Sequence, residues 1–178
     1  MKTLFKLGVV ALAVAAIGTA HAMTKEEMTA KIVGCPNCKA MASYPEMMPN
    51  VRPDIFKTTN GFVETFMVTD PKFLPMCAKF DKDCEANMTA AAKMTPAEFQ
   101  KTYCPVCTGM GALMQRKDVK FEMFNAAMGK VTVATGTTTE GTAACHAFAA
   151  TMQEAITVMP AAMTEIAKTI KPKMSNDQ

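Results

Sequence analysis

The sequence predicts an α+β protein made of two related units within one chain of 178 residues. Three observations lead to this prediction. A CPxC motif occurs twice, each time after a short segment that opens with a helix-capping pair. Each motif is followed by two strand-like segments joined through a glycine, and then by a long helical segment. A repeated order of elements at a nearly fixed spacing is typical of an internal duplication.

The two units match at a spacing that changes only slightly along the chain. The offset is 71 residues at the first helix, 69 at the CPxC motif and 68 at a third cysteine. Small deletions in loops would produce this drift. The matched pairs are Thr24 and Thr95, Cys35 and Cys104, and Cys77 and Cys145.

Each unit is expected to open with two short helices. Thr24 and Glu27 form a capping-box pair, as do Thr95 and Glu98, and Pro96 suits a first helical position. The second helix follows each CPxC motif and is predicted over residues 38–47 and 107–115. Both motifs are therefore expected at helix N-termini.

A β-hairpin and a closing helix complete each unit. Asn60-Gly61 is a strong signal for a tight turn, and Gly129 marks a longer turn in the second unit. The predicted strands cover residues 55–59 and 62–68 in unit one, and 119–125 and 130–135 in unit two. The predicted closing helices cover residues 75–93 and 143–159, with a break or kink at Pro160 and a continuation over 161–170.

The first residues are typical of a signal peptide. Lys2 and Lys6 precede an apolar run over residues 7–17, which is too short to span a bilayer, and Ala20-His21-Ala22 fits a cleavage site. We therefore expect a periplasmic or secreted protein with no membrane insertion after cleavage. The predicted boundaries are residues 1–22 for the signal peptide, 23–94 for repeat unit one, 95–171 for repeat unit two and 172–178 for a flexible tail.

The composition favours a binding protein over an enzyme. The formal net charge is only +3, which argues against nucleic acid as a partner because phosphate binding needs clustered basic residues. His146 would be the single histidine after cleavage, which leaves little for a Ser/His/Asp triad. The sequence contains seven cysteines, and this odd number cannot pair completely within one monomer in an oxidising compartment.

The two CPxC motifs are the leading candidates for a binding site. Cys35 with Cys38, and Cys104 with Cys107, place two sulfurs within reach of one metal ion or of each other. A helix N-terminus also stabilises the thiolate form, which is the form that binds metal. The motifs therefore predict a metal centre or a redox-active pair.

Each CPxC motif is followed by a methionine three residues later, on the same helical face. Met41 follows Cys38 in this way, and Met110 follows Cys107. Thiolate and thioether together select Cu(I) over harder ions, so Cu(I) is the expected cofactor and Zn the alternative. The expected partners are a metal ion and either a periplasmic metalloprotein or a disulfide partner. Most of the 18 methionines are expected to fill the core.

A third cysteine in each unit completes the expected ligand set. Cys77 and Cys145 would each come from a closing helix and join the CPxC pair in a treble-clef-like cage. His146 is a further candidate ligand in unit two, and Cys84 is one in unit one. A local disulfide between Cys77 and Cys84 is the competing interpretation.

The segment Cys104-Pro105-Val106-Cys107-Thr108-Gly109-Met110 resembles the CPVCGM-like motif of YHS-type and related treble-clef-like domains. In these domains the motif precedes a hairpin and another cysteine. The chain is also similar to the copper accessory proteins of nitrous oxide reductase, which are exported and have two related halves. The resemblance covers residues 104–145 and, more loosely, residues 35–77. It implies soft-metal binding or delivery in the periplasm.

Two other functions are compatible with the cysteines. A periplasmic thiol–disulfide oxidoreductase would use a CPxC motif as its redox centre. A non-enzymatic protein stapled by disulfides would need no metal. The sequence favours Cu(I) buffering, tolerance or delivery, and it leaves these two alternatives open.

Overall fold

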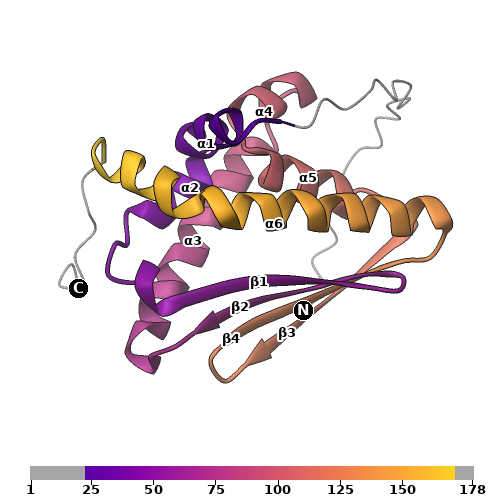
Figure 1. The fold of residues 1–178 in the computed structure, drawn as a ribbon, viewed down its shortest axis with the longest axis horizontal. Coiled ribbons are helices and arrows are strands. Elements are labelled where there is room, and N and C mark those ends of the chain that lie inside the picture. The colour runs from indigo at the N-terminus through magenta and orange to yellow at the C-terminus, as the bar shows by residue number, and fades with distance from the viewer. Residues whose placement is uncertain (1–22, 171–178) are drawn as a thin grey trace.

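The computed structural model describes residues 23–170, so the predicted signal peptide and tail lie outside the described residues. The fold is α+β, as predicted, with helices packed on one face of a four-stranded antiparallel sheet (Figure 1). No helix in this range is long and apolar enough to cross a membrane. The elements are α1 (Lys25–Gly34), α2 (Pro36–Ala42), η1 (Met48–Asn50), β1 (Val51–Thr58), β2 (Gly61–Val68), η2 (Pro71–Phe73), α3 (Leu74–Ala91), α4 (Pro96–Thr102), α5 (Pro105–Met114), β3 (Val119–Ala126), β4 (Gly129–Gly136) and α6 (Thr139–Ala167).

The short helices begin where the capping residues predict. Thr24 and Glu27 form the predicted capping box at the start of α1. Thr95 and Glu98 form the same box before α4, and Pro96 stands in its first turn. Each box satisfies backbone N–H groups that the first helical turn leaves without a partner. The helices α2 and α5 then begin directly after the first cysteine of each CPxC motif.

The two hairpins form one sheet with the strand order β1-β2-β4-β3. Strand β1 begins at Val51, four residues before the predicted start. The strands of the second hairpin each begin 68 residues after their counterparts in the first. The central strands β2 and β4 pair antiparallel, with Val63 opposite Val133. This pairing joins segments that are far apart in the sequence, and it brings the two sets of helices to the same face of the sheet.

Two glycines allow the central strands to approach. A Cβ atom on Gly61 would lie 1.9 Å from the carbonyl oxygen of Ala134, and a Cβ atom on Gly129 would lie 2.1 Å from that of Phe66. Gly129 also has a φ of 151°, a backbone conformation that residues other than glycine rarely adopt. Both ends of the β2–β4 pair therefore require glycine.

Helix α6 spans 29 residues and connects the two ends of the molecule (Figure 1). It runs through Pro160 without a break, and the continuation predicted over residues 161–170 is observed as far as Ala167. A proline inside a helix costs about 3 kcal/mol. Val158 and Ala162, on either side of the proline, are both buried in the core, and this packing offsets the local cost.

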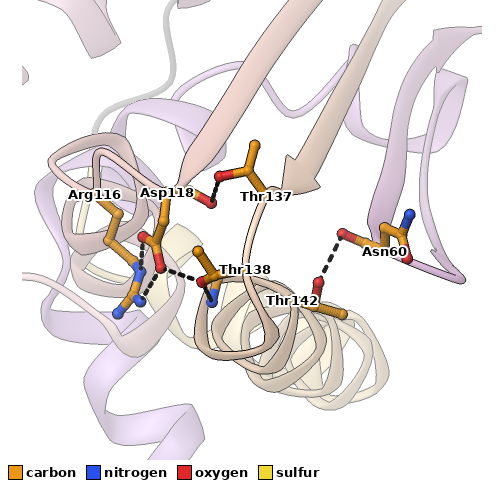
Figure 2. Close-up of polar contacts among 7 residues, drawn as sticks. Asn60, Arg116, Asp118, Thr137, Thr138 and Thr142 are labelled. Carbon is orange, nitrogen blue, oxygen red and sulfur yellow. Dashed lines mark hydrogen bonds and ion pairs between the residues drawn. The ribbon is translucent and has the colours of Figure 1, made fainter.

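Polar contacts fix the N-terminus of α6 to the sheet (Figure 2). The side chain of Thr138 caps the helix by accepting a hydrogen bond from the backbone of Gly141. Its hydroxyl also donates to Asp118, which accepts two hydrogen bonds from Arg116. The Arg116 guanidinium, and then the Thr138 hydroxyl, hold the pKa of Asp118 below its usual range. These contacts hold α6 in place over the sheet.

Candidate metal centre

The four cysteines of the two CPxC motifs lie together. The Sγ atom of Cys35 is 3.7 Å from that of Cys107, and the Sγ atom of Cys38 is 3.9 Å from that of Cys104. Each close contact therefore joins the first cysteine of one motif to the second cysteine of the other. Cys35, Cys104 and Cys107 form a group whose sulfurs all lie within 4.8 Å of one another, and this group could hold a metal ion. We call these four residues the cysteine cluster.

Helix N-termini position the cysteine cluster. Cys35 ends α1 and is the N-cap of α2, while Cys104 is the N-cap of α5. Pro36 and Pro105 occupy the first turn of these helices, where the missing N–H costs nothing. The positive ends of two helix dipoles therefore meet at the sulfurs, and this favours thiolates.

The surroundings of the cysteine cluster are buried and apolar. Cys35 is 0% exposed, Cys104 is 1% and Cys38 is 5%, whereas Cys107 is half-buried. The cluster belongs to a core formed by α1, α2 and the C-terminal half of α6. Ile32 and Ala155 are among its fully buried members. A thiolate site in this core is shielded from water, except on the side of Cys107.

The thiol pKa values follow the position in the motif. The pKa of Cys35 is lowered by hydrogen bonds from the thiols of Cys104, Cys107 and Cys38. The pKa of Cys104 is lowered chiefly by a hydrogen bond from Cys107. The pKa values of Cys38 and Cys107 are raised, first by their hydrogen bonds with Cys104, then by those with Cys35, and then by burial. The pKa values of the two N-cap cysteines are thus lowered and those of the second cysteines are raised, because the four thiols share hydrogen bonds within the cluster.

The predicted third ligands lie in other parts of the core. Cys77 packs with Phe73 and Phe80 between α3 and the sheet. Cys145 packs with Phe62 and Phe148 beneath α6. It lies ten residues before Ala155, about 15 Å along the helix from the part that covers the cysteine cluster. Among the described residues, neither cysteine joins a metal-ligating group.

His146 has a structural partner. Its Nε2–H donates to the carbonyl oxygen of Thr58 at the end of β1, at a distance of 2.9 Å. A carbonyl only accepts hydrogen bonds, so this contact fixes the proton on Nε2. The histidine thus links α6 to the first hairpin.

Cys84 lies on α3 and is half-buried. Burial raises its pKa to about 12, with smaller contributions from Asp81, Asp83 and Cys35. Cys77 and Cys84 are seven residues apart in one helix, so their Cα atoms are about 10 Å apart. Disulfide formation needs less than about 7 Å. The local disulfide considered from the sequence is therefore incompatible with α3.

The two methionines predicted as ligands pack against apolar side chains. Met110 packs in the core beneath α6 that also holds Cys145 and Phe148. Met41 lies at the boundary between the core around the cysteine cluster and the core beneath α3. The structure therefore places these two residues in different surroundings, although their sequence positions match.

Two residues near the cysteine cluster were missed from the sequence. The side-chain amide of Asn37 donates to the Sγ of Cys107 at 3.5 Å and to the Sδ of Met88 at 3.7 Å. Met88 comes from α3 and is exposed. The only sequence signal was the difference between Asn37 in CPNC and Val106 in CPVC.

Comparison with models of protein families gives no match, and neither do comparisons with curated proteins and with solved structures. The conclusions about the cysteine cluster therefore rest on its geometry and chemistry.

Proposed function

We propose that the protein binds one soft metal ion, Cu(I), between its two CPxC motifs, with Zn(II) as the alternative. The observation that carries the proposal is the pair of cross-motif sulfur distances, 3.7 Å and 3.9 Å. In a tetrahedral thiolate site with metal–sulfur bonds of about 2.3 Å, the sulfurs are about 3.8 Å apart. Both cross-motif distances match this spacing, and the sulfurs of Cys35, Cys104 and Cys107 all lie within 4.8 Å of one another, whereas Cys38 would have to move closer to complete a four-sulfur site.

The donor set supports a soft ion. The group that could hold a metal consists of cysteines only, and its surroundings are apolar. Thiolate ligands select Cu(I), Zn(II) or iron–sulfur centres over magnesium or calcium. Cys35, Cys104 and Cys107 alone would suit Cu(I), while Cys38 would complete a four-sulfur site for Zn(II). Met41 and Met110, expected as ligands from the sequence, are left out of this set because of their packing.

A duplication would explain the form of the site. Strands β1 and β2 match β3 and β4 at a constant offset of 68 residues. The matched glycines Gly61 and Gly129 meet matched carbonyl groups. The two cross-motif contacts also exchange places when Cys35 is matched with Cys104 and Cys38 with Cys107. We infer that both halves supply thiolates to one shared ion, rather than each half holding an ion in a treble-clef-like cage of its own.

The biological role that we propose is buffering, tolerance or delivery of copper in the periplasm. The export signal over residues 1–22 and the resemblance of the CPVC segment to YHS-type domains support this role. A thiol–disulfide oxidoreductase is less well supported, because its nucleophilic cysteine must be accessible to a protein substrate. Cys35 and Cys104, the first cysteines of the two motifs, are 0% and 1% exposed.

Anaerobic titration of the apoprotein with Cu(I) or Zn(II) should show one ion bound per chain. A four-sulfur site that includes Cys38 should release more protons per ion than a three-sulfur site without it, because the pKa of the Cys38 thiol is raised and its proton must leave when the sulfur binds the ion. Calorimetry in buffers of different ionisation enthalpy measures this number. Absence of saturable binding would refute the proposal.

The same titration decides between packing and binding roles for the matched methionines. Replacing Met41 and Met110 together by leucine keeps their volume and should leave Cu(I) affinity unchanged if thiolates alone bind the ion. A fall in Cu(I) affinity with an unchanged circular dichroism spectrum would show that the thioethers of Met41 and Met110 are ligands.

A further inference from the structure

We propose that Met88 and Asn37 form an entry port for Cu(I), through which the ion passes from solution to Cys107. This inference rests on the proposed metal binding and adds a route to the site. Two hydrogen bonds define the port: the Asn37 side-chain nitrogen lies 3.7 Å from the Met88 thioether sulfur and 3.5 Å from the Cys107 sulfur. One side-chain amide thus separates the two sulfurs.

The exposure of these side chains decreases in order from solution to the site. Met88 is 37% exposed, Cys107 is half-buried and Cys35 is fully buried. Cys35 lies 3.7 Å from Cys107. A thioether at the surface, followed by a half-buried cysteine and a fully buried cysteine, gives Cu(I) a series of sulfur ligands that leads inward.

The side chain of Asn37 is held only weakly, so it is suited to act as a movable gate between Met88 and Cys107. Its Oδ1 atom is buried and has no hydrogen-bond partner among the described residues. A buried polar atom without a partner costs about 1–3 kcal/mol. Its Nδ2 group donates hydrogen bonds to two sulfurs, which are weak acceptors. Rotation of this side chain away from Cys107 would therefore lose little and would open the path.

The port is held in place by neighbouring contacts. The hydroxyl of Tyr103 donates to the backbone carbonyl of Asn87, at 2.7 Å. Tyr103 directly precedes Cys104 and is 2% exposed, while Asn87 directly precedes Met88. This bond fixes α3 beside the cysteine cluster, so Met88 keeps its position relative to α5.

The port exists on one side of the cluster only. The position that corresponds to Asn37 in the second motif is occupied by Val106, which packs in the core. The position that corresponds to Met88, at the offset of 68, is Ile156, which also packs in the core. The corresponding positions on the second side thus hold apolar residues, and the polar, sulfur-containing side is left for exchange.

The test uses the full mature protein, reduced and without metal. The rate of Cu(I) transfer from its coloured bicinchoninate complex is followed by stopped flow, and equilibrium affinity is measured by competition with the same chelator. Met88→Leu should slow Cu(I) loading by about tenfold and leave the equilibrium affinity within about twofold, because the thioether acts only during transfer. The loading rate with Zn(II) should not change, since Zn gains little from a thioether.

Met114→Leu is the matched control. Met114 is 62% exposed and lies on α5, the helix that carries Cys107. Its replacement should leave Cu(I) loading at the wild-type rate. Asn37→Ala removes the gate and the orphaned oxygen, and should speed loading without lowering the melting temperature.

Equal Cu(I) loading rates for wild type and Met88→Leu would overturn the port, as would equal slowing with Cu(I) and Zn(II). Failure of the wild-type protein to take up either ion would instead refute the proposed metal binding. The two failures are therefore distinguishable in one set of experiments.

Discussion

Replacing Cys35 and Cys104 together by alanine should abolish metal binding, with a loss of affinity well over about a hundredfold. Changes in the outer shell of a metal site already cost ten- to hundredfold, and this double change removes both thiolates at the helix N-caps. Competition with a chelator of known affinity measures the loss. Circular dichroism checks that the fold persists.

The matched control is the replacement of Cys77 and Cys145 by alanine. These cysteines are also buried, so the substitutions remove the same atoms from comparable surroundings. Burial raises the pKa of both thiols, and each lies in a core cluster that does not contain the CPxC cysteines. Metal affinity should therefore stay at the wild-type value. If the control replacement of Cys77 and Cys145 also lost metal binding with the fold intact, the treble-clef-like cages predicted from the sequence would be supported, because those cages contain both the CPxC cysteines and these two residues.

Metal binding should raise the stability of the protein by several kcal/mol. A free ion at a thousand times its dissociation constant adds about 4 kcal/mol, provided that it binds the folded state only. For a domain of this size, that increment corresponds to a rise in melting temperature of about 8–16 °C. The effect is expected because the ion joins α2 to α5, which come from different halves of the chain.

The pH dependence of this increment has a definite sign. Metal binding needs deprotonated thiols, and the raised pKa values of Cys38 and Cys107 mean that protons must leave these residues first. The increment should be present at neutral pH and disappear as the pH falls. Thermal unfolding with and without metal, at about pH 7.5 and about pH 5.5, measures it. An increment that grew on acidification would show that the ligands are not thiols.

Local signals predicted most of the elements. The capping boxes at Thr24 and Thr95 fixed the first helices, because such pairs satisfy backbone groups within a few residues. The turn signal at Asn60-Gly61 predicted the first hairpin, although the two loop residues are Thr59 and Asn60 and Gly61 begins β2. The helix was predicted to continue beyond Pro160 after a break or kink. The absence of a break could not be predicted, because it depends on packing of Val158 and Ala162 against residues distant in the sequence.

The spacing of the cysteines in the sequence could not show which of them come together in the cysteine cluster. Within each unit, the sequence brings Cys35 close to Cys38, but it does not say which distant cysteine faces this pair. That choice depends on the β2–β4 pairing, which places both sets of helices on one face of the sheet. Cys77 and Cys145 recur at matching positions because both fill the core, and buried cysteines commonly behave as small apolar residues. The occurrence of Cys77 and Cys145 at matching positions could not by itself show whether these cysteines pack in the core or bind a metal.

Mapping metal protection at each cysteine tests the central claim most directly. The protein would be purified anaerobically, its bound metal measured, and its thiols alkylated with and without metal before mass spectrometry. The account predicts one soft metal ion per chain, with metal-dependent protection confined to Cys35, Cys38, Cys104 and Cys107, and with the alkylation rate of Cys84 unchanged. Protection of Cys77 or Cys145 by the metal, or cysteine pairs recovered as disulfides with no bound metal, would contradict it.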